Sequence, residues 1–353
     1  SQMCLDILKN SKNFEVKNIK LNYSKEMSDV GRINLSKIKG ILKVKKQIKQ
    51  EIKKFKPDLI YFVPATSGLG LIRDYIFARE IKKKVGKGKI LFHVRSRTIK
   101  NKRNKAIYRK MFQGEKAIVL GEQLVSDVSD YIPEKNIFLL PNAIKNEISE
   151  KQFKKIIKKR EKNKKFNILF LSNMDKTKGW PKLLDACKIL KHKNKGKEKK
   201  INFKCNFVGS FQNEQDKKYF YNFIKKNNLE KEVSYLGRKT GGEKNKILES
   251  SDVLVFPTEY PLETFGRVIV EAMMFSLPVV ANGIATIPNI INHNKTGFIL
   301  KENAGKEIAN YLEKIYKNKK LRISMGKEGR KRFLEKFEMK KYKSKFLRII
   351  RSY

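Results

Sequence analysis

The chain has 353 residues and a formal net charge of +47, from 82 lysines and arginines against 35 aspartates and glutamates. This length predicts two domains rather than one, and the charge predicts an anionic partner: a phosphorylated substrate, nucleic acid or an anionic membrane. The three cysteines have neither paired nor metal-ligand spacing, and no apolar run reaches the roughly 18 residues that a transmembrane helix needs. The composition thus argues against a disulfide-stapled or membrane-spanning protein.

The beginning of the chain predicts an α/β domain that is entered partway through. The first ten residues read as a helix and residues 14–21 as a strand. Because a Rossmann-like domain ordinarily opens with a buried strand and a glycine-rich turn, we expect a natural N-terminal segment before Ser1. Residues 37–56 then place apolar side chains at helical spacing between lysines, which predicts an amphipathic basic helix. That helix would either pack on the core or face a membrane.

A strand predicted at residues 59–63 leads into a turn that contains Gly68 and Gly70. The spacing is similar to a dinucleotide-binding fingerprint, but the third glycine is missing. In such a fingerprint the next strand ends in an acidic residue, whereas residues 90–94 lead into Arg95. We therefore interpret the glycines as a tight turn rather than as part of a NAD site.

His93 and Arg95 are two residues apart in that next strand, so their side chains are expected on one side of it. A lone histidine at a strand end is commonly a hydrogen-bonded structural group. The loop at residues 95–105 is the most basic of the first half, and strands at residues 117–120 and 138–140 follow it.

The second half begins with a basic segment, residues 151–165, which predicts a helical or mobile linker. Three buried strands follow it, and each leads into a short polar or glycine-bearing loop: residues 166–171 lead to Asn173 and Lys178, residues 203–208 to Gly209, and residues 233–236 to Arg238 and Lys239.

Residues 253–281 predict a strand, a loop, a helix and a strand. Ligands of open α/β sheets bind outside the carboxyl ends of the strands, where helix N-termini also point. The turn at residues 264–267 lies there, and free N–H groups at the start of a helix suit a diphosphate. Gly266 lets the backbone approach a ligand closely because it has no Cβ.

Glu263 and Glu271 flank the start of the predicted helix and are two turns apart. Both carboxylates can therefore face one pocket, where each could accept two hydrogen bonds from sugar or ribose hydroxyls. Taken alone, the same spacing also fits a solvated helix face. The surrounding motif decides between the two interpretations.

In order, this part of the chain contains Pro257-Thr258, Glu263, Phe265-Gly266, Glu271-Ala272-Met273, Leu277-Pro278-Val279-Val280-Ala281, Ile287-Pro288 and Thr296-Gly297. The block resembles the donor-site signature of the retaining glycosyltransferases of family four. That family has the GT-B fold, an α/β fold of two Rossmann-like parallel-sheet domains facing a cleft. The resemblance is firm over the second half of the chain and only general over the first.

The resemblance implies an acceptor-binding domain at residues 1–145 and a donor-binding domain at residues 146–334, with a helix at about 335–353 packing back on the first. Glu271 would hold the ribose of the nucleotide, Glu263 the sugar or its neighbouring phosphate, and Lys178 the leaving diphosphate. The other donor-site residues that it implies are Asn173, Gly209, Arg238, Lys239, Thr264, Phe265, Gly266 and Arg267.

Three positions bear on how far the family pattern applies to this chain. His93 matches loosely a histidine that contacts the donor sugar, and Arg95 competes with it for that position. Asn173 stands where relatives carry an arginine near the diphosphate, so a hydrogen bond replaces one charge contact and donor affinity would depend more on Arg267. The acidic residue expected after Ile-Pro is replaced by Asn289.

The resemblance implies a retaining, metal-independent glycosyltransferase, in which the departing diphosphate helps to deprotonate the acceptor. No Asp-x-Asp metal motif stands at a strand end, and no cofactor is expected beyond the nucleotide sugar, most naturally a UDP-sugar. The expected acceptor is a glycan or a polyprenyl-diphosphate-linked glycan of cell-surface polysaccharide synthesis. The enzyme would be cytoplasmic and peripheral on the anionic inner face of the cell membrane.

Two alternatives remain at this point. The charge also fits a basic nucleic-acid-binding protein on a two-domain α/β scaffold, but the basic residues are spread along the chain and no nucleic-acid motif is present, so we expect no nucleic acid as a partner. A phosphorylase-like enzyme on the same fold would need a pyridoxal-binding lysine, and none can be identified.

Overall fold

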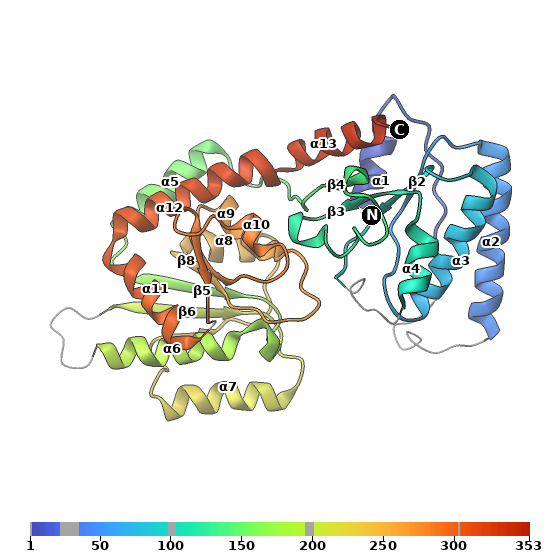
Figure 1. The fold of residues 1–353 in the computed structure, drawn as a ribbon. Coiled ribbons are helices and arrows are strands. Elements are labelled where there is room, and N and C mark those ends of the chain that lie inside the picture. The colour runs from blue at the N-terminus through green and yellow to red at the C-terminus, as the bar shows by residue number, and fades with distance from the viewer. Residues whose placement is uncertain (1, 22–34, 98–103, 195–200, 303) are drawn as a thin grey trace. The chain divides into compact units, whose positions relative to one another are not determined.

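The computed structural model describes residues 2–21, 35–97, 104–194, 201–302 and 304–353, which form two compact units with a parallel sheet each (Figure 1). The first unit contains residues 1–141 together with 343–353, and the second contains residues 142–342. The expected roles of the two, acceptor binding and donor binding, stay predictions.

The first unit has a four-stranded parallel sheet in the order β1-β2-β3-β4. Its strands are runs of apolar residues within one residue of the predicted bounds, as expected for a sheet covered on both faces. The strands are β1 (Ile60–Phe62), β2 (Ile90–His93), β3 (Lys116–Val119) and β4 (Ile137–Leu139). The α-helices are α1 (Gln2–Lys9), α2 (Leu35–Phe55), α3 (Gly68–Val85) and α4 (Lys105–Phe112), with 3₁₀ turns at Glu122–Leu124 and Glu134–Asn136.

One sequence prediction in this unit is wrong, and another lies partly outside the described residues. Residues 14–21 are irregular rather than a strand. Their alternating pattern is a local signal, whereas a strand also needs a neighbour for its backbone groups, and the segment pairs with no strand in the described part of the chain. Of the basic loop predicted at residues 95–105, residues 98–103 lie outside the described residues.

The second unit has a six-stranded parallel sheet in the order β10-β9-β8-β5-β6-β7. The strands are β5 (Phe166–Leu171), β6 (Phe203–Val208), β7 (Val233–Tyr235), β8 (Val253–Phe256), β9 (Val279–Asn282) and β10 (Gly297–Leu300). The helices are α5 (Glu150–Lys162), α6 (Trp180–Lys193), α7 (Glu214–Lys226), α8 (Gly241–Ser250), α9 (Arg267–Met274), α10 (Ile287–Ile290), α11 (Gly305–Lys317) and α12 (Lys319–Arg332). Short turns at Lys176–Lys178 (η6) and Phe333–Phe337 (η7) complete the unit.

Helices cover both faces of this sheet, with α6, α7 and α11 on one face and α5, α8, α9 and α12 on the other (Figure 1). The first face has an aromatic core in which Trp180, Phe207 and Phe220 are fully buried. The basic segment predicted as a helical or mobile linker is the ordered helix α5. Its Arg160 is buried and donates hydrogen bonds of 2.7 Å to Phe275 O and 2.9 Å to Leu248 O, so the helix is part of the unit.

The chain ends in α13 (Met339–Arg351), whose residues from Lys343 onward belong to the first unit. Phe346 of this helix packs edge-on against the Tyr61 ring of β1, with 5.5 Å between ring centroids. The C-terminal segment is therefore part of the core of the first unit.

Candidate functional site

The centre of the six-stranded sheet contains a topological switch point. From β5 the chain proceeds outward to β6 and β7, and β8, β9 and β10 lie on the other side of β5. Such a reversal opens a crevice outside the carboxyl ends of the two central strands, and ligands of α/β sheets bind there. Lys178 follows β5 and Glu263 follows β8, so the topology brings their two loops together.

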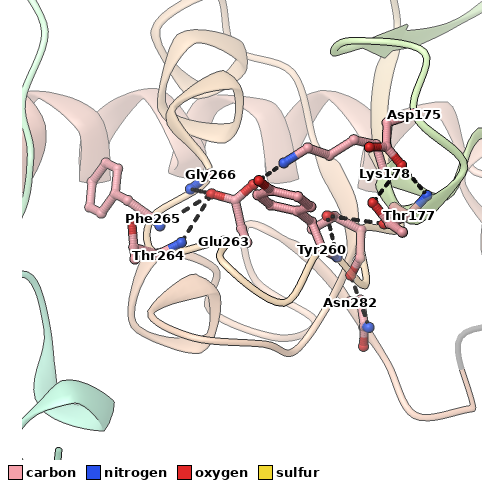
Figure 2. A network of polar contacts seen from close by, with 10 residues as sticks. Asp175, Thr177, Lys178, Tyr260, Glu263, Thr264, Phe265, Gly266 and Asn282 are labelled. Atoms are coloured by element: carbon pink, nitrogen blue, oxygen red, sulfur yellow. Dashed lines mark hydrogen bonds and ion pairs between the residues drawn. The ribbon is translucent and has the colours of Figure 1, made fainter. Parts of the chain in front are cut away.

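The side chains of Lys178 and Glu263 meet at this point (Figure 2). Lys178 Nζ lies 3.0 Å from Glu263 Oε2, and both side chains are only 15% exposed. The same Nζ lies 3.8 Å from the centroid of the Tyr260 ring, a cation–π contact. The turn η6 that carries Lys178 is capped by Asp175, which accepts a 2.8 Å hydrogen bond from Thr177 N. The ammonium group is thus held by Glu263 and Tyr260 of the loop after β8, while Asp175 caps the turn that carries Lys178.

The other carboxylate oxygen of Glu263 faces the backbone of the following turn. Oε1 accepts hydrogen bonds from the N–H groups of Thr264, Phe265 and Gly266 at 3.2, 3.4 and 3.0 Å (Figure 2). Burial by itself would raise the pKa of Glu263, but Lys178 and these donors outweigh it and hold the pKa below its ordinary value. The N–H groups that the sequence suggested as free are therefore engaged by Glu263 in this structure.

Two glycines let the loops of the crevice approach closely. Gly179 has φ +85°, and a Cβ there would overlap the carbonyl of Pro257 at the end of β8. Gly266 has φ +68° at the N-cap of α9, where a Cβ would come within 3.0 Å of Ile269 Cδ1. Both positions favour glycine for its access to left-handed backbone, and Gly179 also for the lack of space.

Glu271 belongs to a second cluster on α9. Its carboxylate pairs with Lys244 Nζ at 2.9 Å and with Arg267 Nε at 3.2 Å, and the residue is 6% exposed. The Arg267 side chain is 72% exposed and lies at the first position of α9. The sequence missed Lys244, because nothing distinguishes it from the many other lysines. Glu271 is therefore ion-paired rather than part of a solvated helix face.

The other expected donor-site residues lie beyond the ends of β5, β6 and β7, at the same edge of the sheet. Asn173 and Arg238 are exposed, and Lys239 pairs with Glu243 at 2.9 Å. Gly209 N donates a 3.0 Å hydrogen bond to Gly237 O. In the described ranges, no hydrogen bond or ion pair joins the side chains of Asn173, Arg238 or Lys239 to the Lys178–Glu263 pair, so their part in ligand binding stays a prediction.

His93 lies in the first unit at the end of β2 and is fully buried. Its Nδ1 is 2.6 Å from the hydroxyl of Tyr61 on the neighbouring strand, and its Nε2 has no hydrogen-bond partner in the described part of the chain. Burial, and then the charge of Arg95, lower its pKa to about 3. The ring is neutral at pH 7, and its expected contact with a donor sugar stays a prediction.

The sequence, like the fold and the crevice, is that of a known enzyme family. Residues 151–332, more than half of the chain, match the family described as Glycosyl transferases group 1. The chain belongs to this family, which confirms the resemblance drawn from residues 253–297 and the prediction of a glycosyltransferase.

Two curated relatives show how far the sequence similarity extends. The chain is 27% identical over 290 residues to the capsular polysaccharide biosynthesis glycosyltransferase CapM of Staphylococcus aureus, covering 78% of this chain and 71% of that protein. It is 31% identical over 180 residues to an uncharacterized 41.2 kDa protein in the cps region of Klebsiella pneumoniae, covering 50% of this chain and 45% of that protein. With the Klebsiella protein, the match thus spans less than half of the relative's length.

Solved structures support the fold. A glycosyltransferase from Rickettsia africae superposes with a TM-score of 0.71 at 20% identity, covering 91% of this chain and 83% of that one. Anabaena HepE, solved in complex with UDP, gives 0.70 at 16% identity and covers 92% and 85%. The prediction of the GT-B fold, with two Rossmann-like domains, is confirmed.

Proposed function

We propose that the second unit binds a nucleotide sugar, in the first place a UDP-sugar, and that the protein transfers the sugar with retention of configuration and without a metal ion. The observation that carries this proposal is the Lys178–Glu263 pair at the switch point of the sheet. A cation and a carboxylate side by side suit the two halves of such a donor, its diphosphate and its sugar hydroxyls. The solved complex of HepE with UDP supports the choice of nucleotide.

In the proposed mechanism, the donor diphosphate takes the place of Glu263 beside Lys178. The ammonium group and the exposed guanidinium of Arg267 then stabilise the negative charge that develops on the leaving diphosphate. The released carboxylate of Glu263 accepts hydrogen bonds from the sugar. The bond between the anomeric carbon and the diphosphate breaks while the acceptor oxygen bonds to the same face, and the proton of the acceptor passes to a phosphate oxygen.

Glu271 is proposed to hold the ribose. Lys244 and Arg267 fix its carboxylate from two sides, and a carboxylate can accept hydrogen bonds from two neighbouring hydroxyls. The exposed Arg267 could turn from Glu271 to the diphosphate while Lys244 continues to hold the carboxylate. Ribose binding and diphosphate binding would thus share one residue.

The proposed acceptor is a glycan or a polyprenyl-diphosphate-linked glycan in the synthesis of a cell-surface polysaccharide. The name of CapM, a capsular polysaccharide biosynthesis glycosyltransferase, supports this class. We place the protein in the cytoplasm, peripheral on the anionic inner face of the membrane, where its charge of +47 would be attracted. Over the described ranges, no helix is both long and apolar enough to cross a membrane.

The donor part of the proposal is tested by thermal unfolding of the intact protein with UDP, GDP, ADP and CMP. A nucleotide present at a hundred times its Kd stabilises the folded state by about 2.7 kcal/mol, so UDP should raise Tm clearly. Sugar transfer from the corresponding UDP-sugar in EDTA, with the product anomer assigned by NMR, tests metal independence and retention. If none of the four nucleotides raises Tm, the crevice does not bind a nucleotide donor.

A further inference from the structure

Exposed apolar side chains concentrate at one end of two helices of the first unit. Of the eight large apolar side chains that are exposed in the described ranges, four lie there: Ile38 and Leu42 on α2, 46% and 59% exposed, and Leu69 and Ile72 on α3, 40% and 48% exposed. Ile38 and Leu42 are four residues apart and Leu69 and Ile72 three, so each pair lies on one face of its helix. Both pairs are therefore largely uncovered by the described part of the chain.

The rest of α2 behaves differently. Val44, Ile48 and Ile52 are buried, and this part of the helix packs along α3. The sequence left open whether the helix packs on the core or faces a membrane. The two parts of the helix differ in the structure. The C-terminal part packs on the core, whereas the first turns expose Ile38 and Leu42.

The two pairs lie at the same end of the unit. Each helix ends just before a strand, α2 before β1 and α3 before β2, and because these strands are parallel the helices run in the same direction. Lys45 and Lys49 of α2 pair with Glu80 of α3 at 3.5 and 3.4 Å, which fixes the helices side by side. Counting back along both at about 1.5 Å per residue places Ile38 near the level of Leu69 and Ile72.

Positive charge accompanies these apolar residues. Lys39, Lys43 and Lys46 are exposed on α2 at positions i, i+4 and i+7, one stripe beside Ile38 and Leu42. Apolar side chains flanked by lysines are typical of helices that lie in the interface of an anionic bilayer. The set is called the α2–α3 face below and consists of Ile38, Lys39, Leu42, Lys43, Lys46, Leu69 and Ile72.

We propose that the α2–α3 face is the surface by which this protein seats on an anionic lipid bilayer, with the apolar side chains entering the headgroup region and the lysines contacting lipid phosphates. A second copy of the chain is a poorer occupant, because two chains of charge +47 repel each other. An anionic bilayer supplies both the apolar and the negative component. The inference rests on the membrane part of the proposed function and is independent of its donor site.

The placement also bears on the acceptor. The N-termini of α2 and α3 lie at the edge of the four-stranded sheet where β1 and β2 end, and ligands of such sheets bind at that edge. A bilayer at the α2–α3 face would therefore present a lipid-linked acceptor at the edge of the first unit that is suited to receive it.

The test is co-sedimentation of the full chain with vesicles of phosphatidylcholine, with and without phosphatidylglycerol. Binding should require the anionic lipid and fall steeply with salt. The double variant Ile38→Ser with Leu42→Ser should lower the partition coefficient about tenfold or more. The triple variant Lys39→Gln, Lys43→Gln and Lys46→Gln should lower it as well.

Matched controls come from α7 of the second unit, which also exposes an aromatic residue and lysines. Tyr221→Ser, and separately the triple variant Lys218→Gln, Lys225→Gln and Lys226→Gln, should bind vesicles like wild type. All variants should keep the Tm and its increase with UDP. If the proposed donor site is wrong, UDP will not raise the Tm. If the α2–α3 face is not the membrane-binding surface, its variants will bind vesicles like wild type.

Three results would overturn the inference. One is equal binding to neutral and anionic vesicles, and another is wild-type binding by the Ile38→Ser, Leu42→Ser variant. The third is a sedimentation-velocity change from oligomer to monomer in that variant while vesicle binding persists, because the face would then join copies of the chain.

Discussion

The Nζ atom of Lys178 lies 3.0 Å from Oε2 of Glu263, although 85 residues separate the two in the sequence. Each residue follows a different central strand, and the switch point between these strands brings them together. The crevice thus contains the Lys178 ammonium group already paired with the Glu263 carboxylate, and both side chains are mostly buried. In such a site the lysine ammonium is oriented before a phosphate arrives, so Lys178 itself needs little reorganisation when the diphosphate takes the place of Glu263.

Lys178→Ala should remove the proposed stabilisation of the leaving diphosphate. We expect a loss of roughly 2 to 4 kcal/mol in transition-state stabilisation, by analogy with the loss of one preorganised donor, with folding intact. The measurement is kcat/KM for sugar transfer, with CD to check the fold. Lys176→Ala is the matched control, since Lys176 lies in the same turn, is 52% exposed and pairs with Asp216 instead. If both variants transfer sugar at nearly the wild-type rate, Lys178 is not the partner of the leaving group.

Tyr260 should act as a positioning residue for Lys178 through its ring. The Nζ atom lies 3.8 Å from the ring centroid, and a contact of this kind contributes roughly 0.5 to 2 kcal/mol. Tyr260→Phe keeps the ring and should keep kcat/KM near wild type, whereas Tyr260→Leu should lower it by an amount in that range. In the double variant with Lys178→Ala, the effect of Tyr260→Leu should disappear. An unchanged effect would mean that the ring acts independently of Lys178.

Glu263 and Glu271 should affect different steps. Glu271→Ala removes the proposed acceptor of the ribose hydroxyls, so it should weaken the binding of UDP measured by calorimetry. Glu263→Ala should leave UDP binding largely intact and lower kcat, because this carboxylate is proposed to contact the sugar during transfer. Glu243→Ala serves as a control, since its carboxylate is 66% exposed and pairs with Lys239. The assignment is wrong if both variants bind UDP and transfer sugar like wild type.

The strands were the part of the fold that the sequence predicted best. Residues 166–171 and 203–208 form strands with the predicted bounds, because each is a short segment rich in aromatic and other apolar side chains that polar residues bound on the N-terminal side. Residues 14–21 were predicted as a strand and are irregular. Their alternation resembles a strand, but pairing depends on an available neighbour, which no local pattern reports.

The residues of the candidate site could be predicted where they belong to a sequence motif. They could not be predicted where they depend on contacts between segments that are distant in the sequence. Glu263 and Glu271 were identified from the block around them, whereas Lys244 was not, because the fold alone brings Lys244 of α8 within reach of Glu271 on α9. The hydrogen bonds that Glu263 accepts from the N–H groups of residues 264–266 were not predicted either. Hydrogen bonds depend on side-chain orientation, which the spacing of residues leaves open.

His93 should make the first unit sensitive to mild acid. Burial lowers its pKa to about 3 from an ordinary value of 6.5, so below pH 6.5 the unfolded chain binds a proton that the folded chain does not. The stability contributed by the neutral ring is therefore present above pH 6.5 and is lost as the pH falls toward 3. Linkage gives a loss of about 2 kcal/mol in the free energy of unfolding between pH 7 and pH 5.

Two measurements check this prediction. In an NMR titration the C2 proton of His93, identified by its absence in His93→Gln, should not shift between pH 5 and pH 8. Denaturant unfolding of the intact protein, followed by CD, should show that His93→Gln loses about 2 kcal/mol less than wild type between pH 7 and pH 5. His192→Gln, which changes an exposed histidine on α6, should keep the wild-type pH dependence. A His93 resonance that titrates near pH 6.5 would show that the ring is accessible to protons, and the expected acid sensitivity would then have no basis.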